Sequence, residues 1–222
     1  MEDKKYTNPL DGLYEIVGDL WSIEKLQEAA EKKTQADSAK PASLPASQKP
    51  DLFPSFDMIY KTADESIDWT DILSGRTLPG IDPASKRGQF LSGIAGEVLA
   101  GSLPAYASVL QEVRPLDDMK PYAHRIRVRA LSADEVQVTF AAFPEDAALN
   151  DAQYAEYLCG IALRCARDIF AVLPVTSVHV TASAKESEVL DVTFSRAAFA
   201  RTRFSFIDPV GYVREQGAVL HV

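Results

Sequence analysis

Two pairs of alternating segments flanking one long helical segment are the pattern that most constrains this chain. Apolar and polar residues alternate over residues 122–130 and 135–143, and again over 175–183 and 189–194. This alternation is typical of strands with one buried and one polar face, and the short connection within each pair predicts antiparallel pairing. Strand pairs arranged around a helix predict an α+β sheet domain over residues 121–222.

One long helix, predicted over residues 151–173, separates the two strand pairs. Asn150 is a suitable N-cap, Gln153 can complete a capping box, and Pro174 cannot continue the helix. Apolar side chains recur at helical spacing and predict a stripe that is buried against the sheet. The stripe comprises Tyr154, Leu158, Ile161, Cys165, Ile169 and Val172.

Other residues of this helix indicate what surrounds it. A glycine inside a helix costs about 1 kcal/mol relative to alanine. Gly160 therefore predicts a packing reason, such as a close approach to the sheet. The charged residues Arg164 and Arg167, together with Glu156 and Asp168, are interpreted as a helix face in contact with solvent.

The first half of the chain divides into three parts by composition. Residues 1–33 are predicted to be a helical arm, and residues 34–50, rich in Ala, Ser, Lys, Gln and Pro, a flexible linker. Residues 51–120 are predicted to be an acidic helical subdomain, with helices over 88–99 and 103–113. The complete prediction is an antiparallel sheet of about four to five strands with one long helix packed on it, preceded by a mostly helical N-terminal half.

Composition limits the partners that this chain can have. Its 222 residues carry 23 basic and 32 acidic side chains, a formal net charge of −9, so nucleic acid is an unlikely partner. No apolar run reaches the roughly 20 residues that cross a bilayer, and the N-terminus lacks the apolar core of a signal peptide. We therefore expect a cytoplasmic protein that does not enter a membrane.

The sequence offers no pattern for a cofactor or a metal ion. Cys159 and Cys165 lie six positions apart on one predicted helix, too far for a disulfide, and we interpret both as structural. The histidines are His124, His179 and His221, and no two of them share a short ligand spacing. We therefore expect no cofactor and no metal site.

Catalytic residues are not evident either. Adjacent carboxylates occur at 64–65 and at 117–118. Two acids can perform acid–base chemistry where burial separates their pKa values, but such pairs more often favour the starts of helices. We assign no catalytic residue and lean against an enzyme.

The most unusual local feature is a strand that carries three arginines at period two. Arg125, Arg127 and Arg129 are expected on the polar face of the sheet, where His179 also projects from another strand. These four residues are the candidate binding residues, because a guanidinium offers a planar fork to phosphate or carboxylate. The interpretation that we favour is cross-strand pairing of the arginines with Asp191, Glu188 or Glu135, a merely structural arrangement.

Several short motifs resemble a group of uncharacterised bacterial α+β proteins with no assigned activity. The motifs are WTDI at 69–72, LAG at 99–101, LPAY at 103–106, PLDD at 115–118, the helix at 154–167 and FAVLPV at 170–175. The resemblance covers about residues 55–222 and leaves out the N-terminal arm. It implies a bacterial α+β protein and carries no catalytic residue over to this chain.

Three functions are compatible with these observations. The first is a non-enzymatic protein-interaction module, possibly one that self-associates. The second is a binder of an anionic small ligand or of nucleic acid through the arginine-bearing face. The third is an enzyme whose residues come together only in the fold. We favour the first, because the predicted helical arm is tethered by a linker, the predicted sheet has one polar face and no catalytic set is present.

Overall fold

A mixed sheet with helices packed on one side forms the body of the protein. The computed structural model describes residues 13–15, 56, 58–76, 79–143 and 149–221. The strands are β1 (Leu13–Glu15), β2 (His124–Ala130), β3 (Glu135–Ala141), β4 (Ser177–Ala184), β5 (Ser187–Ser195) and β6 (Val219–Leu220). The helices are η1 (Ile59–Lys61), α2 (Trp69–Leu73), α3 (Lys86–Leu99), α4 (Leu103–Val113), η2 (Asp117–Met119), α5 (Asp151–Val172), α6 (Arg196–Phe199), η3 (Phe204–Phe206) and α7 (Pro209–Glu215).

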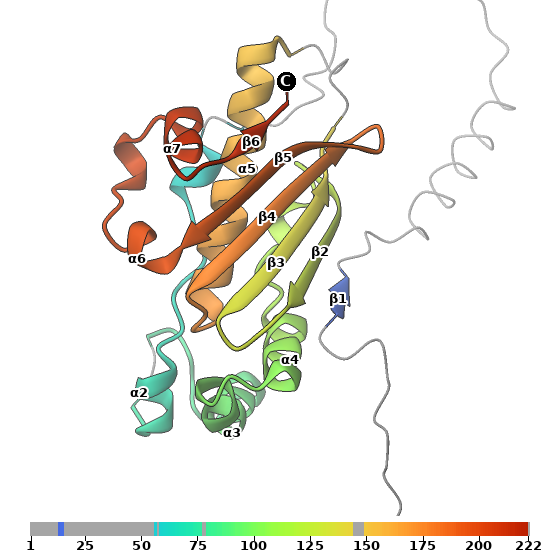
Figure 1. The fold of residues 1–222 in the computed structure, drawn as a ribbon. Coiled ribbons are helices and arrows are strands. Elements are labelled where there is room, and N and C mark those ends of the chain that lie inside the picture. The colour runs from blue at the N-terminus through green and yellow to red at the C-terminus, as the bar shows by residue number, and fades with distance from the viewer. Residues whose placement is uncertain (1–12, 16–55, 57, 77–78, 144–148, 222) are drawn as a thin grey trace, which may run out of the picture.

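The six strands follow the order β1-β2-β3-β4-β5-β6 (Figure 1). Strands β2 and β3 pair antiparallel, and so do β4 and β5, which confirms both predicted pairs. The expectation of a purely antiparallel sheet is wrong at its centre, where β3 and β4 are parallel. The reason is that α5, a helix of 22 residues, carries the chain back to the end of the sheet where β3 began.

The three described residues of the N-terminal segment, Leu13–Glu15, belong to the sheet. The predicted helical arm over 1–33 is wrong at Leu13–Glu15, which form β1 and pair antiparallel with Arg127–Arg129 of β2. The rest of that arm and the predicted linker at 34–50 lie outside the described residues. The described part of 51–120 contains helices only, and these share one apolar core with the sheet.

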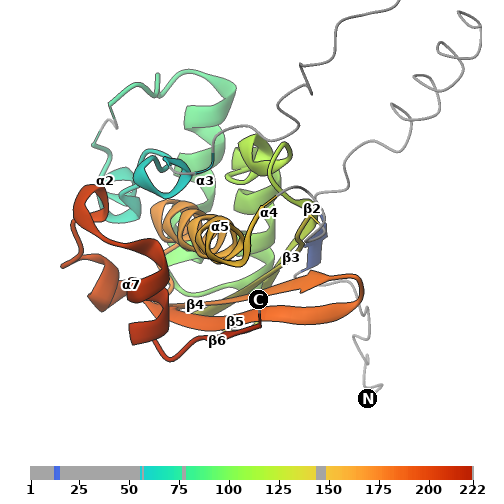
Figure 2. The ribbon, with the colours of Figure 1, turned by 90° about the horizontal axis from the view of Figure 1, so that it is seen from above.

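Helix α5 runs across one face of the sheet, and Figure 2 shows it on the same side as α3 and α4. The predicted capping box is present: the Asn150 side chain accepts the Gln153 N–H, and the Gln153 side chain accepts the Asn150 N–H. Leu158, Ile161 and the rest of the predicted stripe are buried, as expected. The buried residues that alternate along the strands pack against this stripe and complete the core.

The outer side of α5 is also covered, by η1. A Cβ atom on Gly160 would lie 3.1 Å from Cγ2 of Ile59 in η1. The close approach predicted at Gly160 therefore exists, but it is made to η1 and not to the sheet. Helix α7 also packs against α5, and together with η1 and the sheet it leaves α5 with little contact with water over most of its length.

The two ends of α5 are tied to distant parts of the chain. At the carboxyl end the carbonyl of Val172 accepts Trp69 Nε1–H at 2.9 Å, and Arg196 donates to the carbonyl of Leu173. These bonds satisfy carbonyls that have no partner within the helix. Near the amino end the Tyr157 hydroxyl donates to the carbonyl of Tyr122 at 2.6 Å, just before β2.

Truncation of the stripe should unfold the protein more easily. We expect Ile161→Ala to lower the free energy of unfolding by about 2–5 kcal/mol, because Ile161 is fully buried and a cavity remains. Urea denaturation followed by circular dichroism measures the change. Gln111→Ala on the exposed side of α4 is the control and should stay within about 0.5 kcal/mol of the parent protein.

A double-mutant cycle tests the contact between Gly160 and Ile59. Gly160→Ala alone should bring none of the gain of about 1 kcal/mol that alanine normally gives a helix, because its Cβ presses on Ile59. In an Ile59→Ala background the obstacle is gone, and the same change should recover about that gain. A full gain in the parent background would show that η1 does not pack as described.

Candidate functional site

A cluster of buried charges lies between α5 and the segments that cover it. The exposed fraction of Arg164 is 6% and that of Asp168 is 0%. The interpretation of these residues as a solvated helix face is therefore wrong. Arg167 is not freely solvated either, because it donates to the carbonyl of Thr62 at 3.1 Å and its guanidinium stacks over the Phe204 ring at 4.3 Å.

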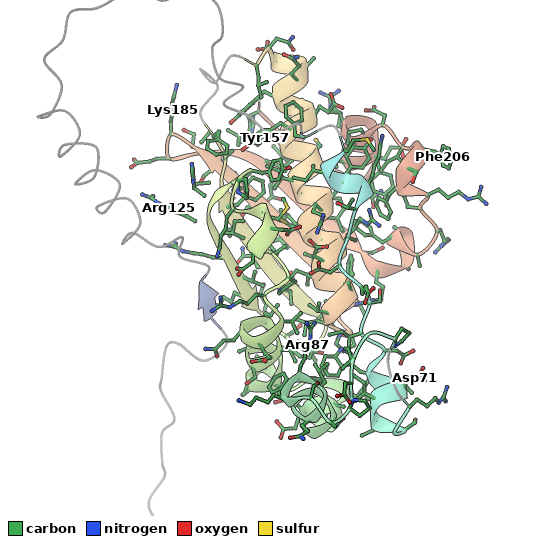
Figure 3. All side chains as sticks on the ribbon, turned by 180° about the vertical axis from the view of Figure 1, so that it is seen from behind. Asp71, Arg87, Arg125, Tyr157, Lys185 and Phe206 are labelled. Atoms are coloured by element: carbon green, nitrogen blue, oxygen red, sulfur yellow. The ribbon has the colours of Figure 1, made fainter. Side chains whose placement is uncertain are left out.

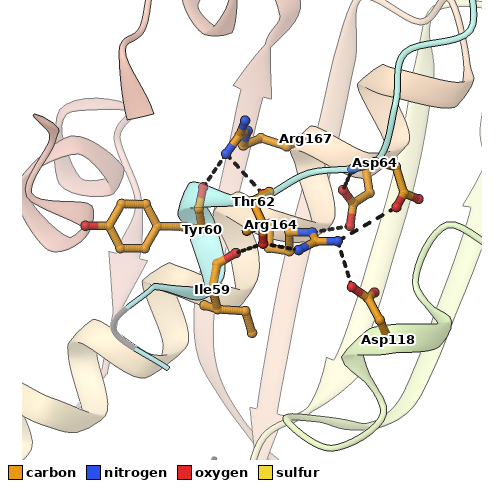
Figure 4. A network of polar contacts seen from close by, with 8 residues as sticks. Ile59, Tyr60, Thr62, Asp64, Asp118, Arg164 and Arg167 are labelled. Atoms are coloured by element: carbon orange, nitrogen blue, oxygen red, sulfur yellow. Dashed lines mark hydrogen bonds and ion pairs between the residues drawn. The ribbon is translucent and has the colours of Figure 1, made fainter. Parts of the chain in front are cut away.

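The guanidinium of Arg164 is the centre of this cluster (Figure 4). Its Nε donates to Asp168 Oδ2 at 2.6 Å, and its Nη2 donates to Asp118 Oδ2 at 2.7 Å. The same Nη2 lies 3.8 Å from Asp64 Oδ1, and Nη1 donates to the Thr62 hydroxyl. One side chain of α5 thus holds η2 and the segment after η1.

Burial and pairing with opposite charges shift the pKa values of this cluster in opposite directions. Burial raises the pKa of Asp168 to about 7, although the Asp64 N–H and Arg164 both favour its ionised form. Burial and the neighbouring Asp118 raise the pKa of Asp64. Burial alone would lower the pKa of Arg164, but Asp168, Asp118 and Asp64 raise it, so Arg164 stays charged.

The cluster holds several segments of the chain together. Every buried polar side-chain atom among the described residues has a hydrogen-bond partner. The described residues contain no group of three His, Cys, Asp or Glu side chains placed to hold a metal ion. Asp117 and Asp118 lie in the first turn of η2, but Asp118 also reaches Arg164.

The stability of the protein should depend on pH through Asp168. Its pKa in the folded protein, about 7, lies above the value near 3.9 of an unfolded chain, so the folded state binds more protons between those pH values. The contribution of this group to stability is therefore present at low pH and is lost as the pH rises through 7. The slope is at most about 1.4 kcal/mol per pH unit.

Comparison with Asp168→Asn isolates this contribution, because all other titrating groups remain. The free energy of unfolding of the parent protein minus that of the variant should fall as the pH is raised from 5 to 8. Urea denaturation at several pH values measures both proteins. A difference that is flat or rises with pH would contradict the assignment.

The face of β2–β5 that points away from α5 is a second candidate, named here the open face. In register across the four strands, Arg129, Gln137, His179 and Thr193 form one row. Arg127, Thr139, Thr181 and Asp191 form the neighbouring row. The side chains of both rows are exposed or half-buried, and they alternate with the buried core residues.

The three arginines predicted on one strand face do not all lie in the rows of the open face. Arg127 and Arg129 are exposed on the open face, as expected. Arg125 has a positive φ of 49°, and the register of β2 with β3 shifts between His124 and Arg127. This β-bulge removes Arg125 from the rows. Figure 3 shows Arg125 at the outer margin of the molecule.

The predicted cross-strand partners of the arginines are not all within reach. Asp191 lies on β5, three strands from β2 and hence about 14 Å away. Its Oδ2 instead pairs with His179 Nε2 at 2.8 Å. Among the described residues, neither Arg125 nor Arg129 forms an ion pair.

Charged side chains of both signs lie on the open face. Basic side chains gather on β2, and Asp191 lies on β5. Between them β3 carries Glu135, Gln137 and Thr139, and β4 carries Thr181 and His179, which pairs with Asp191. Arg201 and Arg203 come after β5 and α6 in the chain, so they do not add to the basic side chains of β2.

Comparison of the chain with protein-family models, with curated proteins and with solved structures gives no match. Over the described part of the chain, no helix has the length and apolar character needed to cross a membrane.

Proposed function

We propose that this protein acts as a non-enzymatic interaction module that binds another protein through its open face. The observation that carries the proposal is the exposed, arginine-bearing stretch of β2 on that face. Arg125, Arg127 and Arg129 are all exposed there, and Asp191 on β5 is paired with His179. An acidic chain that concentrates arginines in this way favours a partner with acidic groups at the matching position.

The shape and charge of the open face favour a protein over other partners. Small ligands bind in concave pockets, whereas this site is the outer face of a sheet. Nucleic acid binding needs a continuous basic surface, and Asp191 on the same face would repel a phosphate backbone. A polar face rich in threonine suits a weak or transient contact with a protein surface.

The location of binding can be tested with a photo-crosslinking amino acid. Placed at Thr181, in the centre of the open face, it should give cross-links to a discrete protein, and excess unlabelled protein should compete them away. Placed at Gln111, on the exposed side of α4, it should give none. Equal labelling from both positions would contradict the proposal.

The contribution of the arginines is tested by changing Arg125, Arg127 and Arg129 together to glutamine. Cross-linking from Thr181 should be lost while the melting temperature is retained, because all three side chains are exposed. Arg201→Gln with Arg203→Gln is the control and removes charges elsewhere. Lost stability with cross-linking retained would make the arginines structural. Salt-dependent retention of the parent protein on heparin would favour the anionic-ligand alternative.

A further inference from the structure

We infer that the outer edge of β2 is a peptide-docking site, which takes an extended acidic segment of a partner protein in place of β1. This inference rests on the proposed function and names how the partner engages the arginines of β2. Strand β1 is then a resident segment that occupies the site while the partner is absent. Addition of a strand to a sheet edge is a recurring way for proteins to bind peptides.

The outer edge of β2 lies beside α4. Strand β2 pairs with β3 along its inner edge, and its outer edge pairs with β1. Helix α4 contacts both β1 and β2, and Figure 2 shows β1 at the margin of the sheet next to β2. A segment at this edge can therefore form main-chain hydrogen bonds with a strand and further contacts with a helix.

The hydrogen bonds between β2 and β3 show which main-chain groups of β2 are directed outward. The Leu131 N–H donates to the Glu135 carbonyl at 2.9 Å, in line with the antiparallel register of these strands. Because such bonds alternate along an antiparallel pair, the main-chain groups of Arg127 and Arg129 are directed to β3 and those of Val128 to the outer edge. An added strand therefore bonds to Val128 and takes non-hydrogen-bonded positions opposite the two arginines, where side chains approach most closely.

The register of β1 indicates which residues the site accepts. In register with Arg129, Val128 and Arg127 are Leu13, Tyr14 and Glu15. Residues of an added strand that are opposite the arginines belong to the open face, and the residue between them belongs to the core side. The resident strand thus has an acidic residue opposite Arg127, which already takes part in interactions within the chain.

Arg129 is not matched in the same way. The residue in register with it on β1 is Leu13, and among the described residues Arg129 forms no ion pair. Glu135 lies diagonal to Arg129 on the inner side, on β3, and does not cover the outer edge. A segment with acidic residues at both open-face positions would therefore complement β2 better than β1 does.

Strand β1 can leave without disturbing the rest of the sheet. It spans three residues and β2 spans seven, and residues 16–55 separate it from Phe56, the next described residue. Because β1 is the end strand, the pairing of β2 to β6 does not depend on it. While β1 is in place, the apparent affinity for a partner is reduced by the fraction of time that the edge is free.

Binding of labelled synthetic peptides to the purified full-length protein, followed by fluorescence anisotropy, tests the site. One peptide has the sequence of residues 10–18, and a second carries Leu13→Glu. The second should bind about 2- to 5-fold more tightly, the effect of one cross-strand ion pair. A third peptide with Tyr14→Pro should not bind, because proline has no N–H for the Val128 carbonyl. Equal binding of the proline peptide would overturn the inference.

The role of Arg129 is tested in the protein. Arg129→Gln should abolish the preference for the Leu13→Glu peptide and keep the melting temperature, because this side chain is exposed. Arg201→Gln removes a charge elsewhere and should keep the preference. A preference that persists in Arg129→Gln would show that the peptide does not bind at this edge.

The role of β1 is tested by weakening it in the full chain. Tyr14→Pro removes its main-chain bond to Val128 and should raise the affinity for the Leu13→Glu peptide, about 10-fold where the parent edge is free about a tenth of the time. Glu15→Lys places a like charge opposite Arg127 and covers a loss of folding in the proline variant. Peptides that bind neither variant, or that bind both as the parent protein does, would overturn the inference.

The two proposals fail in different ways. If no peptide binds while Thr181 cross-links a discrete protein, the interaction function stands and the edge site is wrong. If the peptides bind as expected but Thr181 gives no cross-link, the edge site stands and binding through the centre of the open face is wrong. If neither occurs, both proposals are wrong.

Discussion

Burial of α5 on two sides is the constraint on which the rest of this structure depends. The sheet covers one side of the helix, and η1 covers the other at Gly160. A helix without a solvent face cannot leave its polar groups to water, so each must find a partner in the protein. Trp69 and Arg196 supply partners for carbonyls at its carboxyl end, and both come from segments distant in the sequence.

The charged cluster follows from the same constraint. Removing an ion from water costs several kcal/mol, and an arginine on a covered helix face is tolerated only when carboxylates and hydroxyls surround it. Asp168 comes from the same helix, whereas Asp118 and Thr62 come from segments packed against it. The cluster therefore fixes the path of the chain before β2. The guanidinium of Arg164 is held by groups from three segments of the chain.

Local patterns predicted the elements of the fold because strand and helix periods report burial directly. Features that depend on contacts between residues far apart in the sequence were not predicted. The i, i+4 spacing of Arg164 and Asp168 is the same for a surface pair and a buried one, and the covering segment lies about a hundred residues earlier. The bulge at Arg125 was invisible because Ile126 and Val128 keep the alternation. Placement of Arg127, Arg129 and His179 on one face needed only period two.

The alternation that buries one face of a sheet also places polar residues on the other face. It does not determine which polar residues these are. In this protein threonines of β3 and β4 lie in the middle of the open face, and charged side chains lie on β2, at the start of β3 and on β5. A charge at the rim of a contact stays partly hydrated, so it directs the orientation of a partner at little desolvation cost.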